Sequence, residues 1–250
     1  MKPLTFVLVH GAWHGAWCWA RVSPLLRAAG FDAHAVTLTG LGERAHLLSN
    51  DITLLTHIQD VLGLIAAEEL KNIVLVGHSY GGRVITGVAD ALLSRGEVKL
   101  HHLVYLDAMV PKSGESWSST YSAQVIDARI QSAHAYEALH GVAAITPPDA
   151  SIFGLTGDDA AWVNRRQTPQ PLGVYLGEAT APYLQFDETR LALQARTFID
   201  CNAPALATID VSRRRVREQI GWRVVEMHTG HDPMVSHPEA LAVELLQCAR

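Results

Sequence analysis

The sequence predicts an α/β fold with a mostly parallel central sheet, helices on both faces and an inserted helical lid. Short apolar runs alternate with helix-length segments over residues 1–111 and again over residues 189–250. The runs are continuously apolar rather than alternating, which is typical of strands buried on both faces. Residues 112–188 interrupt this order with a stretch rich in Ser, Ala, Pro and Gly, which we interpret as the lid.

The first predicted strands and helices follow from the spacing of apolar residues and from the glycine that ends a helix. Phe6–Val9 is an apolar run and predicts a strand. Trp17–Ala29 is expected to be a helix that stops at Gly30, because glycine favours the left-handed turn that ends helices. Phe31–Val36 predicts the next strand. Thr53–Leu70 carries apolar residues at helical spacing, namely Leu54, Ile58, Val61, Leu62 and Ile65.

The middle of the chain contains the strand around which the rest is organised. Asn72–Val76 predicts a buried strand, and Arg83–Leu93 predicts the helix that follows it. Leu103–Leu106 is another apolar run, which ends at Asp107. Within the lid, Tyr121–His140 has a helical pattern, whereas pairs of prolines break the remainder.

The last elements return to the alternating order. We expect strands at Phe198–Ile199 and Trp222–Val225, with a helix at Ser212–Gln219 between them. A closing helix is expected at Pro238–Cys248, since proline is favoured in the first turn of a helix. Parallel sheets bind ligands at the carboxyl ends of their strands, so the loops after these strands are the places to look for a site.

Composition excludes several classes of protein. The 250 residues carry a net charge of −5, which does not favour a nucleic-acid or anionic-membrane partner. Apolar stretches stay short of the roughly 18 residues of a membrane span, so we expect a cytoplasmic protein. The three cysteines are far apart, which predicts buried free thiols rather than a zinc site or disulfide framework. The basic run from Arg213 to Arg217 is interpreted as a solvated helix face.

The expected strand at Asn72–Val76 runs into Gly77-His78-Ser79-Tyr80-Gly81. Gly-x-Ser-x-Gly between a strand and a helix is the pattern of a nucleophile elbow, in which a sharp turn exposes the serine above the sheet edge. The glycines let strand and helix approach closely. Ser79 is therefore the predicted nucleophile, and an ordinary glycine-rich turn is the alternative interpretation.

A serine nucleophile needs a base and two N–H donors for the oxyanion. His231 is the predicted base, because it lies in the loop Thr229-Gly230-His231-Asp232-Pro233 after the last expected strand. The donors are predicted to be the backbone N–H of Tyr80 and that of Ala12, with Trp13 as the alternative to Ala12. His10 and His14 lack a convincing third ligand nearby, so we expect no metal and no other cofactor.

Three motifs carry a resemblance to a known family: His10 to Trp19, the loop from Leu38 to Arg44, and the elbow from Gly77 to Gly82. They resemble the α/β-hydrolase superfamily, and within it the branch of plant methyl esterases, hydroxynitrile lyases and bacterial pyrethroid-hydrolase-like carboxylesterases. The similarity is strongest over residues 4–111, weakens through the lid and returns near His231. It implies the α/β-hydrolase fold.

The acid of the triad departs from the pattern of the plant relatives. These carry an aspartate in the loop after the strand that here ends at Ile199, and the matching position falls near Ala203. Asp107 follows the expected strand at Leu103–Leu106, and some α/β hydrolases place the acid there. We therefore predict Asp107 as the acid and keep Asp200 as the alternative.

The resemblance also bears on the reaction. Hydroxynitrile lyases of this branch carry a threonine at the position of Gly11 and a lysine at that of Asp232. An aspartate there would repel departing cyanide, so we expect a serine hydrolase that cleaves a carboxylic ester through an acyl-enzyme. Other reactions at the same triad and a non-catalytic ligand receptor remain alternatives.

The expected partner is a small to medium apolar ester, and the sequence leaves a homodimer open. Several large side chains of the lid are expected to line an apolar pocket. These are Trp117, Tyr121, Ile126, Tyr136, Phe153 and Trp162.

Overall fold

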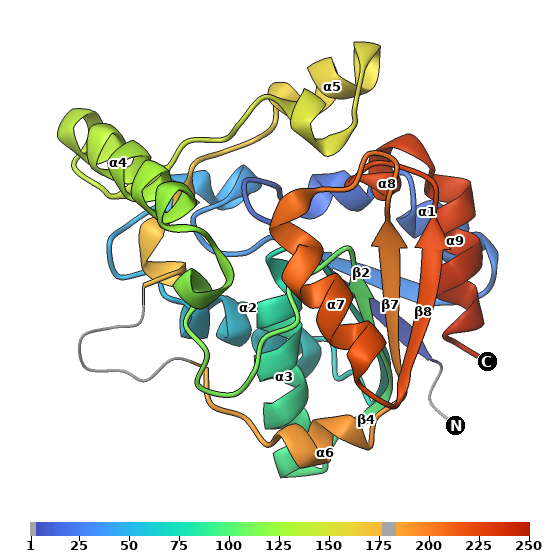
Figure 1. Cartoon of the computed structure of the whole chain (residues 1–250). Helices are drawn as coiled ribbons and strands as arrows, with labels where there is room; N and C mark the ends of the chain where they lie inside the picture. Colours follow the sequence, from blue (N-terminus) through green and yellow to red (C-terminus); the bar gives the residue numbers. More distant parts are fainter. Residues whose placement is uncertain (1–3, 177–183) are drawn as a thin grey trace.

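A six-stranded parallel sheet forms the centre of the molecule, in a computed structural model that describes residues 4–176 and 184–250 (Figure 1). The strand order is β2-β1-β3-β4-β7-β8. The strands are β1 (Thr5–Val9), β2 (Asp32–Val36), β3 (Asn72–His78), β4 (Lys99–Leu106), β7 (Arg196–Cys201) and β8 (Trp222–Met227). All pairs are parallel, so the carboxyl ends of the strands meet at one edge of the sheet.

The two faces of the sheet bury alternate residues of each strand. In β1, Val7 and Val9 belong to one apolar cluster, whereas Phe6 and Leu8 belong to the other. All four side chains have no exposed surface. Successive side chains of a strand point to opposite faces, so a strand covered on both faces needs the continuous apolar run that the sequence shows. The predicted fold class is confirmed.

Helices cover both faces of this sheet (Figure 1). One face carries α2 (Leu54–Ala67), α3 (Gly81–Arg95) and α7 (Asp210–Glu218), and the other carries α1 (Ser23–Ala28) and α9 (Pro238–Gln247). A short helix, α8 (Pro233–Ser236), follows the loop that contains His231. The apolar face of each helix packs on the strands, which fixes the loops between them at the carboxyl edge.

The chain between β4 and β7 holds further helices and a small sheet. Its elements are α4 (Ala123–His140), α5 (Gly157–Asn164), α6 (Glu188–Ala192) and the two-stranded sheet of β5 (Ala144–Ile145) and β6 (Gln170–Pro171). Figure 1 shows α4 and α5 beyond the carboxyl ends of the strands, whereas α6 lies at the opposite end near α3. Helices α4 and α5 therefore lie over the carboxyl edge.

The structure corrects the helix predicted at Trp17–Ala29. The segment instead forms a 3-10 turn at Ala16–Trp19, followed by the separate helix α1 from Ser23. Pro24 explains the break, because proline lacks the N–H that a continuous helix would need and is tolerated only in the first turn.

Other boundaries move by a few residues. The elbow strand extends to His78, and α3 runs from Gly81 to Arg95 rather than from Arg83 to Leu93. The three cysteines are buried free thiols, as predicted. Over residues 4–176 and 184–250, no helix has the length and apolar character that a membrane crossing requires.

Candidate active site

Three loops at the carboxyl edge of the sheet contain residues in an unusual backbone conformation. Trp13 after β1, Ser79 after β3 and Asp107 after β4 have φ angles of 64°, 52° and 38°. Residues other than glycine rarely adopt positive φ, and the strain persists only where the surrounding structure enforces it. The described residues include one other example, Glu69, which lies away from this edge. The strained positions therefore concentrate where the sequence predicts a site.

Tight packing around the elbow enforces the conformation of Ser79. A Cβ atom on Gly77 would lie 2.7 Å from the Gly81 carbonyl oxygen, and one on Gly81 would lie 2.8 Å from the His10 carbonyl oxygen. The Ser79 carbonyl accepts hydrogen bonds from the N–H groups of Gly82 and Met109. Strand β3 and helix α3 thus approach as closely as the glycines of the motif predict.

The loop after β8 brings His231 to the same edge. Its Nδ1 lies 2.6 Å from Oδ2 of Asp107, and both side chains are almost fully buried. A carboxylate only accepts hydrogen bonds, so Nδ1 carries the proton and Nε2 is left with a lone pair. The backbone N–H of His231 donates to the Phe153 carbonyl, and its own carbonyl accepts from His78 Nε2 at 2.9 Å. These contacts fix the loop on both sides.

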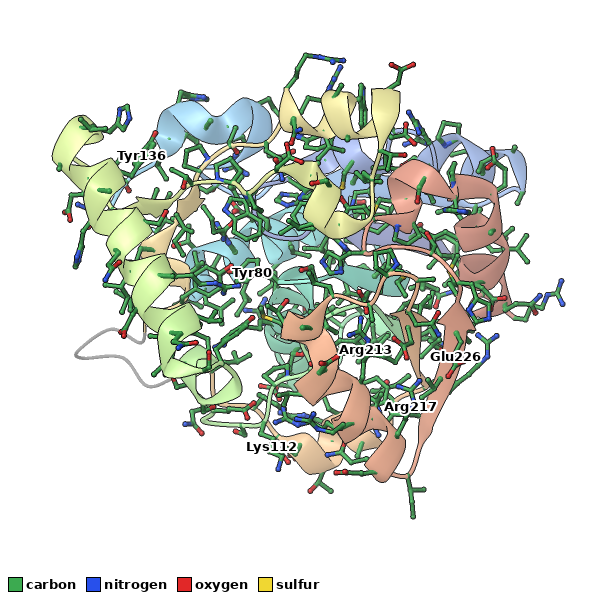
Figure 2. All side chains as sticks on the ribbon, turned by 45° about the horizontal axis from the view of Figure 1, so that its top comes forward. Tyr80, Lys112, Tyr136, Arg213, Arg217 and Glu226 are labelled. Atoms are coloured by element: carbon green, nitrogen blue, oxygen red, sulfur yellow. The ribbon has the colours of Figure 1, made fainter. Side chains whose placement is uncertain are left out.

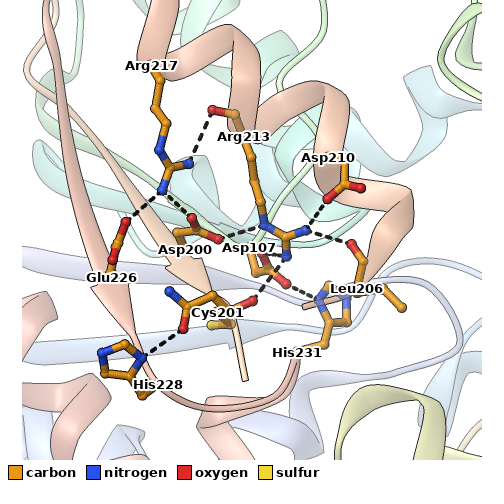
Figure 3. A network of polar contacts seen from close by, with 11 residues as sticks. Asp107, Asp200, Cys201, Leu206, Asp210, Arg213, Arg217, Glu226, His228 and His231 are labelled. Carbon is orange, nitrogen blue, oxygen red and sulfur yellow. Dashed lines mark hydrogen bonds and ion pairs between the residues drawn. The ribbon is translucent and has the colours of Figure 1, made fainter. Parts of the chain in front are cut away.

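A buried arginine joins the two aspartates considered as the acid (Figure 3). Arg213 donates from Nη2 to Oδ1 of Asp107 at 2.7 Å and from Nε to Oδ1 of Asp200 at 2.6 Å. Asp200 also accepts from Arg217 at 2.5 Å. The structure therefore places Asp107, and not Asp200, against the imidazole, while Asp200 is bound by two guanidinium groups.

The expected solvated helix face at Arg213–Arg217 is wrong for Arg213 and also for Arg215, whose largely buried side chain binds Glu115. Arg213 is only 7% exposed and points from α7 toward the strand ends, whereas Arg217 bridges Asp200 and Glu226 (Figure 3). A run of arginines on a helix resembles a solvated face in sequence, because two of the carboxylates that bind it, Asp107 and Glu115, lie 106 and 100 positions away along the chain. The aspartate at the end of each of two apolar runs, Asp107 after Leu106 and Asp200 after Ile199, was the signal available for a buried cation.

The loop after β1 offers backbone donors toward Ser79. The N–H of Trp13 donates to the side-chain oxygen of Gln170 at 3.1 Å, so this group is already bound. Within residues 4–176 and 184–250, the N–H groups of Ala12 and Tyr80 have no acceptor. These two groups are the ones that the sequence predicts as oxyanion donors. The contact of Gln170 with this loop could not be read from the sequence.

The side chain of Tyr80 is anchored below the site. Its hydroxyl lies 3.0 Å from Nδ1 of His57, and Nε2 of His57 lies 2.9 Å from the Thr39 carbonyl. Since the carbonyl only accepts, Nε2 carries the proton and the tyrosine hydroxyl donates to Nδ1. Burial lowers the pKa of His57 to about 4, which agrees with a neutral ring.

A second buried pair, His14 and Asp232, ties the two catalytic loops together. Nδ1 of His14 lies 2.7 Å from the Ala12 carbonyl, and Nε2 lies 3.1 Å from Oδ2 of Asp232. Both partners only accept hydrogen bonds, so both nitrogens of the ring must carry protons and His14 is an imidazolium. Burial alone would lower the pKa of His14, but the Asp232 carboxylate raises it above its usual value.

The same ion pair lowers the pKa of Asp232. Burial alone would raise its pKa, but the charge and hydrogen bond of His14 lower it to about 2. The loop that carries Ala12 and the loop that carries His231 are therefore joined by a buried ion pair. The sequence did not predict this ion pair. The available signal was the position of each residue in the chain, because His14 closely follows Gly11 and Asp232 directly follows His231.

One group of described residues has the spacing of a metal site. Ligand atoms of His78, His231 and Asp232 lie within 4.8 Å of one another. Each is already engaged within the protein: His231 with Asp107, Asp232 with His14, and His78 with the His231 carbonyl. The donor set therefore fits a hydrogen-bonded network around the histidine loop, and we assign it to that network.

A pocket opens over Ser79 at this edge. Its walls combine the loops after β1 and β3, the histidine loop, the chain after β7 and residues of the segment between β4 and β7. The described lining residues are Ala12, Trp13, His14, His78, Ser79, Tyr80, Met109, Arg129, Ile152, Phe153, Tyr175, Leu206, Thr208 and His231.

The expectation that several bulky lid residues line the pocket holds for Phe153 alone among the six named. Trp162 packs on Trp17, with ring centroids 5.1 Å apart. Tyr136 stacks on His140 at the end of α4, away from Tyr80 at the centre of the molecule (Figure 2). The sequence shows which lid residues are large and apolar, but it does not show which face of a lid helix packs against the rest of the protein.

Comparisons with known proteins agree with this architecture. The model of the alpha/beta hydrolase family matches residues 6–245. A carbendazim hydrolyzing esterase from Nocardioides sp. is 41% identical over 244 residues, covering 96% of this chain and 97% of that protein. Methylesterase 7 of Arabidopsis thaliana is 26% identical, covering 98% and 95% of the two chains.

A solved structure supports the same fold. An extracellular α/β-hydrolase from a Paenibacillus species superimposes with a TM-score of 0.78 at 22% identity, covering 98% of this chain and 99% of that one. The predicted resemblance, including its methyl-esterase branch, is confirmed. The chain belongs to the alpha/beta hydrolase family.

Proposed function

We propose that this chain is a serine esterase, in which Ser79 attacks the carbonyl of a carboxylic ester and forms an acyl-enzyme. The observation that carries the proposal is the hydrogen bond of 2.6 Å between Asp107 and His231, because His231 lines one pocket together with Ser79. A buried carboxylate on Nδ1 leaves Nε2 able to accept a proton, which is what a serine nucleophile requires. The activity printed in the names of the relatives, ester hydrolysis, supports the same reaction.

The proposed reaction runs in two halves. His231 takes the proton of Ser79 as its Oγ attacks the carbonyl carbon, and the resulting oxyanion accepts hydrogen bonds from the N–H groups of Tyr80 and Ala12. His231 then gives the proton to the departing alkoxide. Water, deprotonated by the same histidine, attacks the acyl-enzyme and releases the acid and free Ser79.

Asp107 holds the tautomer of His231 and offsets the positive charge that the ring gains during the reaction. Arg213 binds the other oxygen of this carboxylate, so Oδ2 stays directed at the imidazole. We propose Arg213 as a positioning residue that acts through Asp107.

The segment at residues 112–188 is the proposed lid, and it would supply one wall of the pocket. Ile152, Phe153 and Tyr175 come from this segment and face the same pocket as Ser79. Mostly apolar walls with few polar groups are typical of sites for small organic substrates. A small to medium ester with an apolar body is the proposed substrate.

Cyanohydrin cleavage is the second reaction that the resemblance raises, and Gly11 disfavours it. A Cβ atom there would lie 2.8 Å from both Ser79 Cβ and His78 Nδ1, so this chain has no room for the threonine of the lyases. Asp232 does not disfavour the lyase reaction through its charge, contrary to what the sequence led us to expect. Asp232 is fully buried, pairs with His14 and is not among the described pocket residues, so it does not face a leaving group.

The test is kcat/KM for short and medium p-nitrophenyl esters, measured for the wild type and Ser79→Ala side by side. The proposal expects turnover by the wild type and a loss of several orders of magnitude in the variant, because the nucleophile is gone. Activity that survives the substitution would contradict the proposal. A wild type that binds the esters without turnover would favour the non-catalytic receptor.

A further inference from the structure

The active-site pocket contains a cation that its described surroundings do not neutralise. Arg129 projects from α4 and lines the pocket together with Ser79 and His231. None of the described lining residues is an aspartate or glutamate. The guanidinium instead lies over the ring of Tyr121 at 4.5 Å, with the rings of Trp117 and Tyr175 at 5.6 Å. Aromatic faces hold the charge in place without supplying a hydrogen-bond acceptor.

One donor atom of this guanidinium is both buried and unused. Nη1 of Arg129 is buried and has no hydrogen-bond partner among the described residues. Three other arginines near the lid are paired with carboxylates: Arg21 with Asp159, Arg190 with Asp90 and Arg215 with Glu115. A buried donor without an acceptor is unfavourable, so a ligand that supplies an acceptor at this point would be stabilised.

A second arginine adds positive charge beside the pocket. Arg83 on α3 is 5% exposed, and its Nε also lacks a partner within the described chain. It lines a neighbouring cavity that shares Met109 and Thr208 with the active-site pocket. The nearby carboxylate Glu115 is bound to Arg215, and Asp107 is bound to Arg213. The pocket is therefore electropositive in a chain whose net charge is −5.

We propose that the site takes esters that carry a carboxylate, such as the monoesters of small dicarboxylic acids, with Arg129 binding that carboxylate. This inference rests on the proposed esterase function and names its substrate class. A guanidinium presents parallel N–H donors that match a carboxylate, and the aromatic rings fix its plane. The apolar walls would hold the carbon chain between the carboxylate and the ester carbonyl above Ser79.

The experiment compares two methyl esters of equal size: monomethyl succinate, which is anionic, and methyl succinamate, in which a neutral amide replaces the carboxylate. We measure kcat/KM for both with the wild type, Arg129→Gln, Arg129→Lys and Arg166→Gln. Arg166 is the matched control, since it is an exposed arginine of the same segment that lies over Trp162 and not in the pocket.

The expected result is a preference of the wild type for the anionic ester. Arg129→Gln should lower the ratio of the two kcat/KM values by about 10-fold to 100-fold, the range for a hydrogen bond to a charged group. The loss should appear mainly in KM, because the carboxylate is bound equally in the ground and transition states. Arg129→Lys should retain part of the preference, and Arg166→Gln should retain all of it.

Two results would overturn the inference: a wild type that prefers the neutral ester, or a ratio that Arg129→Gln leaves unchanged. If Arg129→Gln does not fold, competitive inhibition of the wild type by succinate and by succinamide decides instead. The inference then expects succinate to bind more tightly, and equal inhibition contradicts it. Failure of the esterase proposal is distinguishable, because the wild type would then hydrolyse neither these methyl esters nor the p-nitrophenyl esters. Hydrolysis of the p-nitrophenyl esters alone would contradict this inference and leave the esterase proposal standing.

Discussion

Replacing Asp107 by asparagine tests the geometry of the site most sharply, because the structure fixes how the new amide must lie. One oxygen of Asp107 accepts from Arg213 Nη2 at 2.7 Å and the other accepts from His231 Nδ1 at 2.6 Å. Arg213 can only donate, so the asparagine oxygen must face Arg213 and its NH₂ group must face His231. The imidazole would then accept at Nδ1 and carry its proton on Nε2, where it cannot take the proton of Ser79.

The expected loss follows from that wrong tautomer. In a serine hydrolase this substitution lowers kcat by about 10⁴-fold while leaving the geometry intact. The matched control is Asp200→Asn, because Asp200 also binds Arg213 but does not contact His231. We expect Asp200→Asn to lower the free energy of unfolding and to keep kcat/KM for p-nitrophenyl acetate within about tenfold of the wild type.

A double variant separates the tautomer from a general loss of charge. Arg213→Met removes the donor that orients the amide, so in Asp107→Asn/Arg213→Met the asparagine oxygen is free to turn toward His231. Part of the activity lost in Asp107→Asn should return, provided that circular dichroism shows both proteins folded. Asp107 is not the residue that orients His231 if Asp107→Asn stays within a few-fold of the wild type while Asp200→Asn abolishes turnover.

The remaining predictions concern Gly11 and the buried pair of His14 and Asp232. Gly11→Ala should lower kcat/KM by about tenfold or more, because its Cβ would lie 2.8 Å from Ser79 Cβ. Steady-state kinetics measure this loss, and unchanged activity would contradict the prediction. Because folding raises the pKa of His14, its ion pair should contribute its full stability at pH values below the ordinary histidine pKa of 6.5. This contribution should be lost as the pH rises through the pKa of His14 in the folded state. The lowered pKa of Asp232 contributes stability above its ordinary value of 3.8, which is lost as pH falls through about 2. Urea unfolding between pH 6 and 9 should therefore show an alkaline decline in the wild type that His14→Gln lacks, and equal declines would count against the ion pair.

The sequence predicted the parts of the site that depend on local motifs. The apolar run before Gly77 and the glycines around Ser79 specify a strand, a sharp turn and a helix, and the structure has this turn with its close packing. The position of Asp107 after β4 could be inferred because parallel strands end at one edge. The turn could be predicted because it rests on residues that are neighbours in the chain, and the position of Asp107 because one rule covers all parallel strands.

The parts that failed depend on contacts between distant segments. Arg213 binds Asp107 across 106 positions of the chain, and a pattern of arginines on one helix carries no trace of that partner. The pair of His14 and Asp232 spans 218 positions. The helix predicted at Trp17–Ala29 failed for a local reason, since the break at Pro24 was visible but was outweighed by the surrounding apolar residues.

Mass spectrometry of rapidly quenched reactions can detect the proposed acyl-enzyme on Ser79 itself. The wild type and Ser79→Ala are mixed with p-nitrophenyl butyrate, stopped in acid within milliseconds to seconds, and examined intact and as peptides. We expect a butyryl group on the peptide that contains Ser79, together with a burst of p-nitrophenol, and neither signal in Ser79→Ala. Turnover with no burst and no acylated peptide at any quench time, or with the acyl group on another residue, would contradict the proposed acyl-enzyme.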